Sequence, residues 1–265
     1  GHSSHYIETG AGSPIILIHG FFYDTQMWHN NIQALAAQFK VYALDLWGFG
    51  YSTREPLDYG YSLYAGQLLQ FMDALHIERA SMIGQSMGGG TIVKFTLSHR
   101  DRIHKAILVA PAGMPNPLPP MARIANLPLI GELMYGLQSD FFRRLALKTN
   151  FIHNPAHISD AYFENVTRFH KIRGTSEVML TTLGKRFFDT LLPDIRAYGE
   201  GSVPTLLVWG REDRSTPVEL GIAMNALLPN SRLEIFDEAG HCPHDEQPAQ
   251  FNQLAVDFLT NALAV

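Results

Sequence analysis

Residues 80–97 have the sequence ASMIGQSMGGGTIVKFTL, and this stretch decides the fold. Ala80–Ile83 is short and apolar and predicts a buried strand, whereas Met87–Leu97 predicts a helix. Between them Gly84, Ser86 and Gly88 form G-x-S-x-G, which occurs by chance in roughly one chain in ten, so its strand-to-helix context carries the argument. A sharp turn of this kind needs small flanking residues and presents a strained, accessible serine. The alternative is a glycine-rich turn in which Ser86 only caps the helix.

Short apolar runs alternate with helical patterns along the rest of the chain. The runs are β-branched or leucine-rich and end near Gly, Pro or Asp, as do strands that are buried on both faces. The predicted strands are Ile15–Ile18, Val41–Leu44, Ala80–Ile83, Lys105–Val109, Thr205–Trp209 and Arg232–Phe236. We therefore predict an α/β fold with a mostly parallel, doubly wound sheet.

Three stretches between these strands repeat apolar residues at helical spacing, and we interpret them as core-facing helix stripes. The stripes are Ile32, Leu35, Ala36 and Phe39; Ala65, Leu68, Leu69, Met72 and Leu75; and Phe251, Leu254, Ala255, Phe258 and Leu259.

The alternation is interrupted once. Six of the 15 prolines lie between Pro111 and Pro128, and no strand pattern returns until about Thr205, which is too long a gap for an ordinary loop. The gap is rich in aromatic residues and predicts helices at Phe141–Lys148, Ile158–Phe169 and Ser176–Phe188. We predict a core of residues 1–113 and 198–265 with a helical cap inserted at 114–197.

Composition excludes several classes of protein. Of the 265 residues, 46% are hydrophobic, which argues against disorder, and the net charge of −5 with a pI near 6.2 disfavours partnership with nucleic acid or a membrane surface. The single cysteine, Cys242, excludes an internal disulfide and a cysteine-based zinc site. The apolar runs are too short to span a bilayer.

The amino-terminal residues show no basic-then-apolar signal pattern, so a cytoplasmic location is the default prediction. The sequence opens at Gly1 without a Met, which leaves a removed leader as an open alternative.

Two further side chains complete a possible catalytic set. A serine hydroxyl needs an adjacent base that is itself oriented by an acid. Asp213 follows the strand Thr205–Trp209, and His241 follows Arg232–Phe236. Because the carboxyl ends of parallel strands meet at one edge of the sheet, we expect Ser86, Asp213 and His241 to converge there.

A developing oxyanion also needs hydrogen-bond donors. The loop after Ile15–Ile18 can direct the backbone N–H of Phe21 at the reacting carbonyl, and the N–H of Met87 lies at the positive end of the elbow helix.

Together these motifs resemble the α/β-hydrolase family. The resemblance rests on HGF at 19–21, DLWGFGYS at 45–52, the Ser86 elbow, Gly210-x-x-Asp213 and Gly240-His241. The resemblance covers nearly the whole chain. Its motifs are specific for the fold and the triad but not for the substrate. The insertion resembles the family's variable cap only in its position along the chain. The family's usual strand before the segment that resembles His5–Thr9 has no counterpart, which predicts a sheet without that edge strand.

Other polar residues have plainer interpretations. The resemblance implies a structural role for Asp45, in tying down its loop. His153 and His157 are separated by Pro155 and have no adjacent Asp, Glu or Cys, which disfavours a metal site. His244 is predicted to hydrogen-bond within its loop, and Cys242 to fill a small buried space. Most arginines of the insertion should be solvated, although Arg143, Arg144 or Arg186 facing the cleft can bind a substrate carboxylate.

The sequence predicts a serine hydrolase that cleaves small to medium carboxylic esters through an acyl-enzyme, with no metal or organic cofactor. The resemblance leaves two alternatives. One is a carbon–carbon bond hydrolase of aromatic meta-cleavage products, and the other is a ligand-binding homologue with little turnover. Relatives with an Asp nucleophile at the elbow are disfavoured by Ser86, and the oligomeric state and natural substrate stay undetermined by the sequence.

Overall fold

The computed structural model describes residues 1–116, 140–184, 191–201 and 203–261. Its centre is a seven-stranded sheet in the order β1-β3-β2-β4-β5-β6-β7, in which only β1 is antiparallel to its neighbour. The strands are β1 (Tyr6–Thr9), β2 (Pro14–Ile18), β3 (Lys40–Leu44), β4 (Ala80–Gln85), β5 (Ile103–Val109), β6 (Thr205–Gly210) and β7 (Ser231–Phe236). The predicted mostly parallel sheet is confirmed, and all six predicted strands are present.

The edge strand β1 adds to the predicted set. It pairs with β3 over its whole length, from Tyr6 opposite Leu44 to Thr9 opposite Val41. β1 is the first strand in the described part of the chain.

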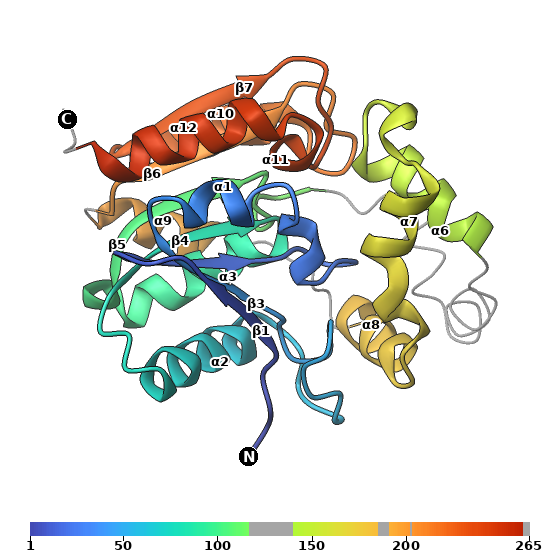
Figure 1. Cartoon of the computed structure of the whole chain (residues 1–265). Coiled ribbons are helices and arrows are strands. Elements are labelled where there is room, and N and C mark those ends of the chain that lie inside the picture. The colour runs from blue at the N-terminus through green and yellow to red at the C-terminus, as the bar shows by residue number, and fades with distance from the viewer. Residues whose placement is uncertain (117–139, 185–190, 202, 262–265) are drawn as a thin grey trace.

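Helices cover both faces of the sheet (Figure 1). One face packs against α2 (Tyr61–Ala74), α3 (Met87–Ser98), α9 (Leu192–Glu200) and α10 (Val218–Leu227), and the other against α1 (Ile32–Ala36) and α12 (Pro248–Thr260). The three predicted apolar stripes all lie in these two hydrophobic clusters. This doubly wound arrangement buries the central strands on both faces, which is why they are almost wholly apolar.

The insertion forms a group of helices beside the sheet (Figure 1). It comprises α6 (Asp140–Ala146), a π-helical turn η3 (Leu147–Phe151), the 3-10 turn η4 (Pro155–His157), α7 (Asp160–Thr167), the 3-10 turn η5 (Arg168–Lys171) and α8 (Thr175–Gly184). The three predicted helices correspond to α6 with η3, α7 with η5, and α8, although the predicted end at Phe188 lies outside the described residues. Leu147, Phe163 and Val166 of the insertion pack in the same cluster as Tyr23 and Met27 of the core, so the insertion is seated on the core as a cap.

The carboxyl-terminal boundary of the cap stays a prediction. The predicted boundary at residue 197 falls inside α9, whose Ile195 and Tyr198 pack in the cluster formed by the sheet and α3. Asp194 also pairs with Lys94 of α3 at 3.0 Å. α9 therefore packs against the sheet and α3.

Within the described ranges, none of the helices combines the length and apolar character that crossing a membrane requires.

Candidate active site

Ser86 occupies the turn between β4 and α3 in a conformation that is rare for a residue with a side chain. Its φ is +49° and its ψ is −111°. The backbone here is tightly packed, because a Cβ on Gly88 would lie 2.2 Å from the Ile18 carbonyl oxygen and one on Gly84 would lie 2.6 Å from the carbonyl carbon of Gly88. The glycines therefore supply the space that the sequence pattern demanded.

The same geometry contradicts the alternative in which Ser86 only caps the helix. An N-cap serine has an extended backbone and accepts an N–H from the first turn. The Ser86 side chain makes no such hydrogen bond, and the residue is partly exposed.

Asp213 and His241 meet as predicted. His241 Nδ1 lies 2.8 Å from Asp213 Oδ2, and the two residues are 1% and 6% exposed. The other carboxylate oxygen, Oδ1, accepts the backbone N–H groups of Ser215 and Thr216, each at 2.8 Å, and the Thr216 hydroxyl donates to Oδ2 at 2.7 Å. With Nδ1–H donated to the carboxylate, the Nε2 of His241 is left as the basic nitrogen of the ring.

The loop of His241 is joined to the elbow through Gln85. The Gln85 side-chain amide donates to the His241 carbonyl oxygen at 3.0 Å, and Gln85 directly precedes Ser86. A hydrogen bond between Ser86 Oγ and the His241 ring is not among the polar contacts that the described residues make. Catalytic hydrogen bonds are often long in the absence of substrate and shorten when substrate binds.

The loop after β2 lies against the elbow. A Cβ added to Gly20 would be 3.3 Å from Ser86 Cβ, so the segment that contains Phe21 passes close to the serine. Met87 is the first residue of α3, where backbone N–H groups have no partner within the helix. Phe21 and Met87, the two predicted oxyanion donors, thus flank Ser86 from different elements.

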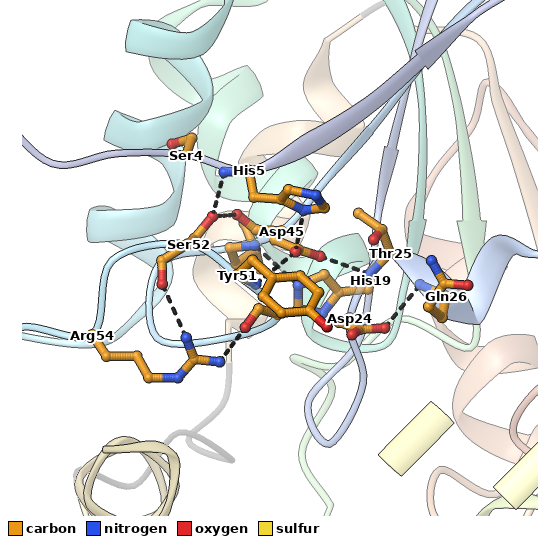
Figure 2. Close-up of polar contacts among 12 residues, drawn as sticks. Ser4, His5, His19, Asp24, Thr25, Gln26, Asp45, Tyr51, Ser52 and Arg54 are labelled. Carbon is orange, nitrogen blue, oxygen red and sulfur yellow. Dashed lines mark hydrogen bonds and ion pairs between the residues drawn. The ribbon is translucent and has the colours of Figure 1, made fainter. Parts of the chain in front are cut away.

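Asp45 has the structural role that the resemblance implied. Its Oδ1 accepts the Thr25 N–H at 2.7 Å, and its Oδ2 accepts the Tyr51 N–H at 2.9 Å and lies 2.7 Å from His5 Nδ1 (Figure 2). The carboxylate therefore ties three segments together and is completely buried. The pKa of Asp45 is lowered: burial acts to raise it, but the His5 and backbone hydrogen bonds outweigh this effect.

Asp24, which the sequence analysis did not single out, lies in the same cluster (Figure 2). Its Oδ1 accepts the Gln26 N–H at 2.8 Å and begins the 3-10 turn η1 (Thr25–Trp28), but Oδ2 has no hydrogen-bond partner among the described residues. Burial, reinforced by the neighbouring Asp45 carboxylate, raises the pKa of Asp24 to about 7. The sequence offers only a capping pattern here, and nothing in it indicates the perturbed carboxyl.

The histidines considered in the sequence, His153, His157 and His244, have different surroundings in the structure. His157 lies 3.6 Å from Asp245, while His153 donates its backbone N–H to Glu246, so the two residues serve separate contacts. The prediction that His244 hydrogen-bonds within its loop is wrong. Its ring nitrogens have no partner among the described residues, and the ring packs 4.5 Å from Trp28. Burial lowers its pKa to about 4, so the ring is a neutral part of the core.

The remaining candidates are less directly involved. Cys242 is completely buried in the hydrophobic cluster, as predicted, and burial raises the pKa of its thiol. Arg143 is buried and donates to Asp140 at 2.7 Å, whereas Arg144 reaches Asp160 on the surface. Arg186 lies outside the described residues. Within the described ranges, no three His, Cys, Asp or Glu side chains are grouped so as to hold a metal ion.

The cap also contacts the site through hydrogen bonds that the sequence patterns did not predict. The Phe151 carbonyl oxygen accepts the His241 N–H at 2.8 Å, and the two rings lie 5.7 Å apart. Glu246 accepts the N–H groups of Gly240 and His153, both at 2.7 Å. The only sequence signal for these contacts is the abundance of aromatic residues in the insertion.

A serine at a strained strand-to-helix turn and a buried Asp–His pair, both on a doubly wound sheet, define the class: a hydrolase of the α/β fold. A family model described as the alpha/beta hydrolase fold matches residues 13–248, and the chain belongs to that family. The resemblance stated from the motifs is thereby confirmed.

Individual relatives agree with the family assignment. A 2-hydroxy-6-oxononadienedioate/2-hydroxy-6-oxononatrienedioate hydrolase of Paraburkholderia phymatum is 32% identical over 272 residues, covering 96% of this chain and 90% of the relative. The solved structure of a meta-cleavage product hydrolase from Pseudomonas fluorescens has a TM-score of 0.84 and 26% identity, covering 97% of this chain and 94% of that one. A thermophilic esterase from Thermogutta terrifontis has a TM-score of 0.82 and 26% identity, covering 97% and 93%.

Proposed function

We propose that Ser86, His241 and Asp213 form a catalytic triad that hydrolyses small to medium carboxylic esters through an acyl-enzyme. The observation that carries this proposal is the buried 2.8 Å hydrogen bond between His241 Nδ1 and Asp213 Oδ2. It fixes the tautomer that leaves Nε2 basic, on a loop that Gln85 joins to the Ser86 elbow.

In this mechanism His241 Nε2 removes the hydroxyl proton as Ser86 Oγ attacks the ester carbonyl. The N–H groups of Phe21 and Met87 stabilise the resulting oxyanion. The tetrahedral intermediate collapses as the imidazolium protonates the leaving alcohol, while Asp213 stabilises the charged ring. Water activated by the same nitrogen then attacks the acyl-enzyme and releases the acid. These steps use side chains and backbone groups of this chain alone.

Carbon–carbon bond hydrolysis is the second candidate, because relatives at about 30% identity are named hydrolases of 2-hydroxy-6-oxononadienedioate and 2-hydroxy-6-oxononatrienedioate. Their dienedioate substrates are acidic, so the same activity here needs a cationic group near the cleft. Arg143 is buried and already hydrogen-bonds to Asp140, which disfavours it as the group that binds a substrate carboxylate.

A panel of nitrophenyl esters, lactones and vinylogous diketones, assayed with wild-type protein and Ser86→Ala, tests the proposal. We expect turnover of esters by the wild type and loss of that turnover in the variant. Turnover of the vinylogous diketones at a higher kcat/KM than the esters would favour the second candidate. Absence of turnover with every class would favour a ligand-binding homologue and contradict both enzymatic proposals.

A further inference from the structure

The residue after Phe21 in its loop, Phe22, contacts two residues of the cap. Phe22 has a φ of +78°, a conformation that is rare for a residue with a side chain. Such a conformation persists only where surrounding contacts impose it. The contacts that do so at Phe22 come mostly from the cap.

His170 makes the polar contact. This residue belongs to η5, is 6% exposed, and places its Nε2 3.1 Å from the carbonyl oxygen of Phe22. Its ring also packs 4.3 Å from the Phe22 ring. On the other side, Phe151 stacks on Phe22 with ring centroids 5.5 Å apart and an interplanar angle of 23°.

The direction of this hydrogen bond follows from the protonation state of His170. Burial lowers its pKa to about 3, and the nearby charges of Arg143 and Arg54 act in the same direction, so the ring is neutral near pH 7. A carbonyl oxygen only accepts, so Nε2 carries the single ring proton and donates it to Phe22.

We propose that His170 is a positioning residue of the cap, which holds the oxyanion loop through the Phe22 carbonyl so that the Phe21 N–H stays directed at the substrate. This inference rests on the proposed function. Loss of an oxyanion donor costs roughly 10²–10³ in kcat, and a donor that is displaced rather than removed costs less. The cap thereby contributes to transition-state stabilisation as well as covering the site.

Three variants separate positioning from packing. His170→Phe keeps an aromatic ring but removes the donor, whereas His170→Gln retains an N–H at about the position of Nε2. Val166→Ala is the packing control, because Val166 is completely buried in α7, shortly before η5, and its side chain has no polar atom. We expect His170→Phe to lower kcat for a nitrophenyl ester about 10- to 100-fold with KM changed less than about threefold. His170→Gln should recover most of this loss, and Val166→Ala should lower thermal stability with kcat near that of the wild type.

Amide hydrogen exchange provides a readout that needs no turnover. In His170→Phe, a peptide spanning residues 19–25 should exchange at least about tenfold faster than in wild type, His170→Gln and Val166→Ala. Unchanged exchange in His170→Phe would overturn the inference whatever the kinetics, and so would faster exchange with an unchanged kcat. Failure of wild-type protein to hydrolyse any ester would instead refute the proposed function, while the exchange data still decide whether His170 holds the loop.

Discussion

At the scale of single residues, the hydrogen bonds of two buried carboxylates distinguish their roles. Asp213 accepts from a neighbouring turn and from His241, whereas Asp45 accepts from Thr25 and Tyr51 and lies beside His5. Both are buried acids near strand ends, so burial alone does not separate them. The location of the partner histidine does: His241 lies on the loop that Gln85 joins to the Ser86 elbow, whereas His5 directly precedes the edge strand β1.

The triad should behave as one unit. We expect Ser86→Ala and His241→Ala each to lower kcat by roughly three or more orders of magnitude, and the double variant to be little worse than either, because each single change disables the same step. Steady-state kinetics with a nitrophenyl ester measures all three. Losses that multiply in the double variant would indicate that the two residues act independently.

Substitution of the two acids should give opposite phenotypes. Asp213→Asn should lower kcat by roughly three to four orders of magnitude, because the amide favours the wrong His241 tautomer. Asp45→Asn should instead lower the free energy of unfolding by about 1–3 kcal/mol, since a buried backbone N–H loses its acceptor. Ester kinetics and urea unfolding of both variants test this pair, and exchanged phenotypes would show that the acid is misassigned.

Asp24 should make stability depend on pH. Its pKa of about 7 in the folded protein lies above the value near 4 of an unfolded aspartate, so the folded state binds more protons between these values. The free energy of unfolding therefore falls as pH rises from about 4 to 7 through this group. Asp24→Asn keeps an oxygen for the Gln26 N–H and should stabilise the protein by about 2–4 kcal/mol at pH 8, with a smaller gain toward pH 4. Urea unfolding of both proteins across this range measures the difference, and a constant offset at all pH values would contradict the assignment.

At the scale of elements, the loop before the short helix α11 (Pro243–Glu246) connects His241 to the cap. Glu246 accepts one N–H from Gly240 and another from His153, with one carboxylate oxygen for each. The His241 N–H goes to the Phe151 carbonyl oxygen. The backbone around His241 is therefore held between Glu246 of α11 and the cap segment at residues 151–153.

Glu246→Gln tests this connection, because an amide offers one acceptor oxygen where the carboxylate offers two. We expect the free energy of unfolding to fall by about 1–3 kcal/mol, as one backbone N–H loses its partner. Glu212→Gln is the control, since among the described residues Glu212 accepts just the Ala239 N–H, and an amide oxygen can still do so. Equal losses in the two variants, measured by urea unfolding, would show that the second acceptor is unimportant.

At the scale of the whole molecule, the cap and the core share one hydrophobic cluster. Met179, Phe163 and Leu147 of the cap pack with Phe22 and Tyr23, which follow β2. The cap therefore presents apolar side chains to the core where the two parts meet. A substrate bound under the cap should meet apolar side chains and few fixed polar groups.

This arrangement leads us to expect a preference for short to medium acyl chains over acetate. Each buried methylene contributes about 0.8 kcal/mol, so kcat/KM should rise with chain length until the covered pocket is full and then fall for long chains. Nitrophenyl esters of two to sixteen carbons, assayed with wild type and with a cap aromatic replaced by Ala, measure this profile, and the replacement should shift the optimum toward bulkier acyl groups. A flat profile, or a maximum at the longest chain, would exclude a pocket closed by the cap.

The sequence by itself determined the sheet, the helix faces and the three catalytic candidates, because these depend on local patterns. Apolar period and glycine spacing are imposed by backbone geometry at adjacent positions, so Ser86 at its elbow and Asp213 and His241 after their strands are readable along the chain.

Only the tertiary structure decided how the cap takes part. The contacts of His170 with Phe22 and of Glu246 with His153 join segments with no shared periodicity, and the perturbed Asp24 carboxyl arises from burial and from the charge of Asp45, which its own neighbours do not encode. The error over His244 has the same origin, because a polar residue in a loop pattern becomes a core residue once Trp28 packs against it. Local sequence fixes what each segment can form, whereas desolvation and long-range hydrogen bonds exist only after the segments have come together.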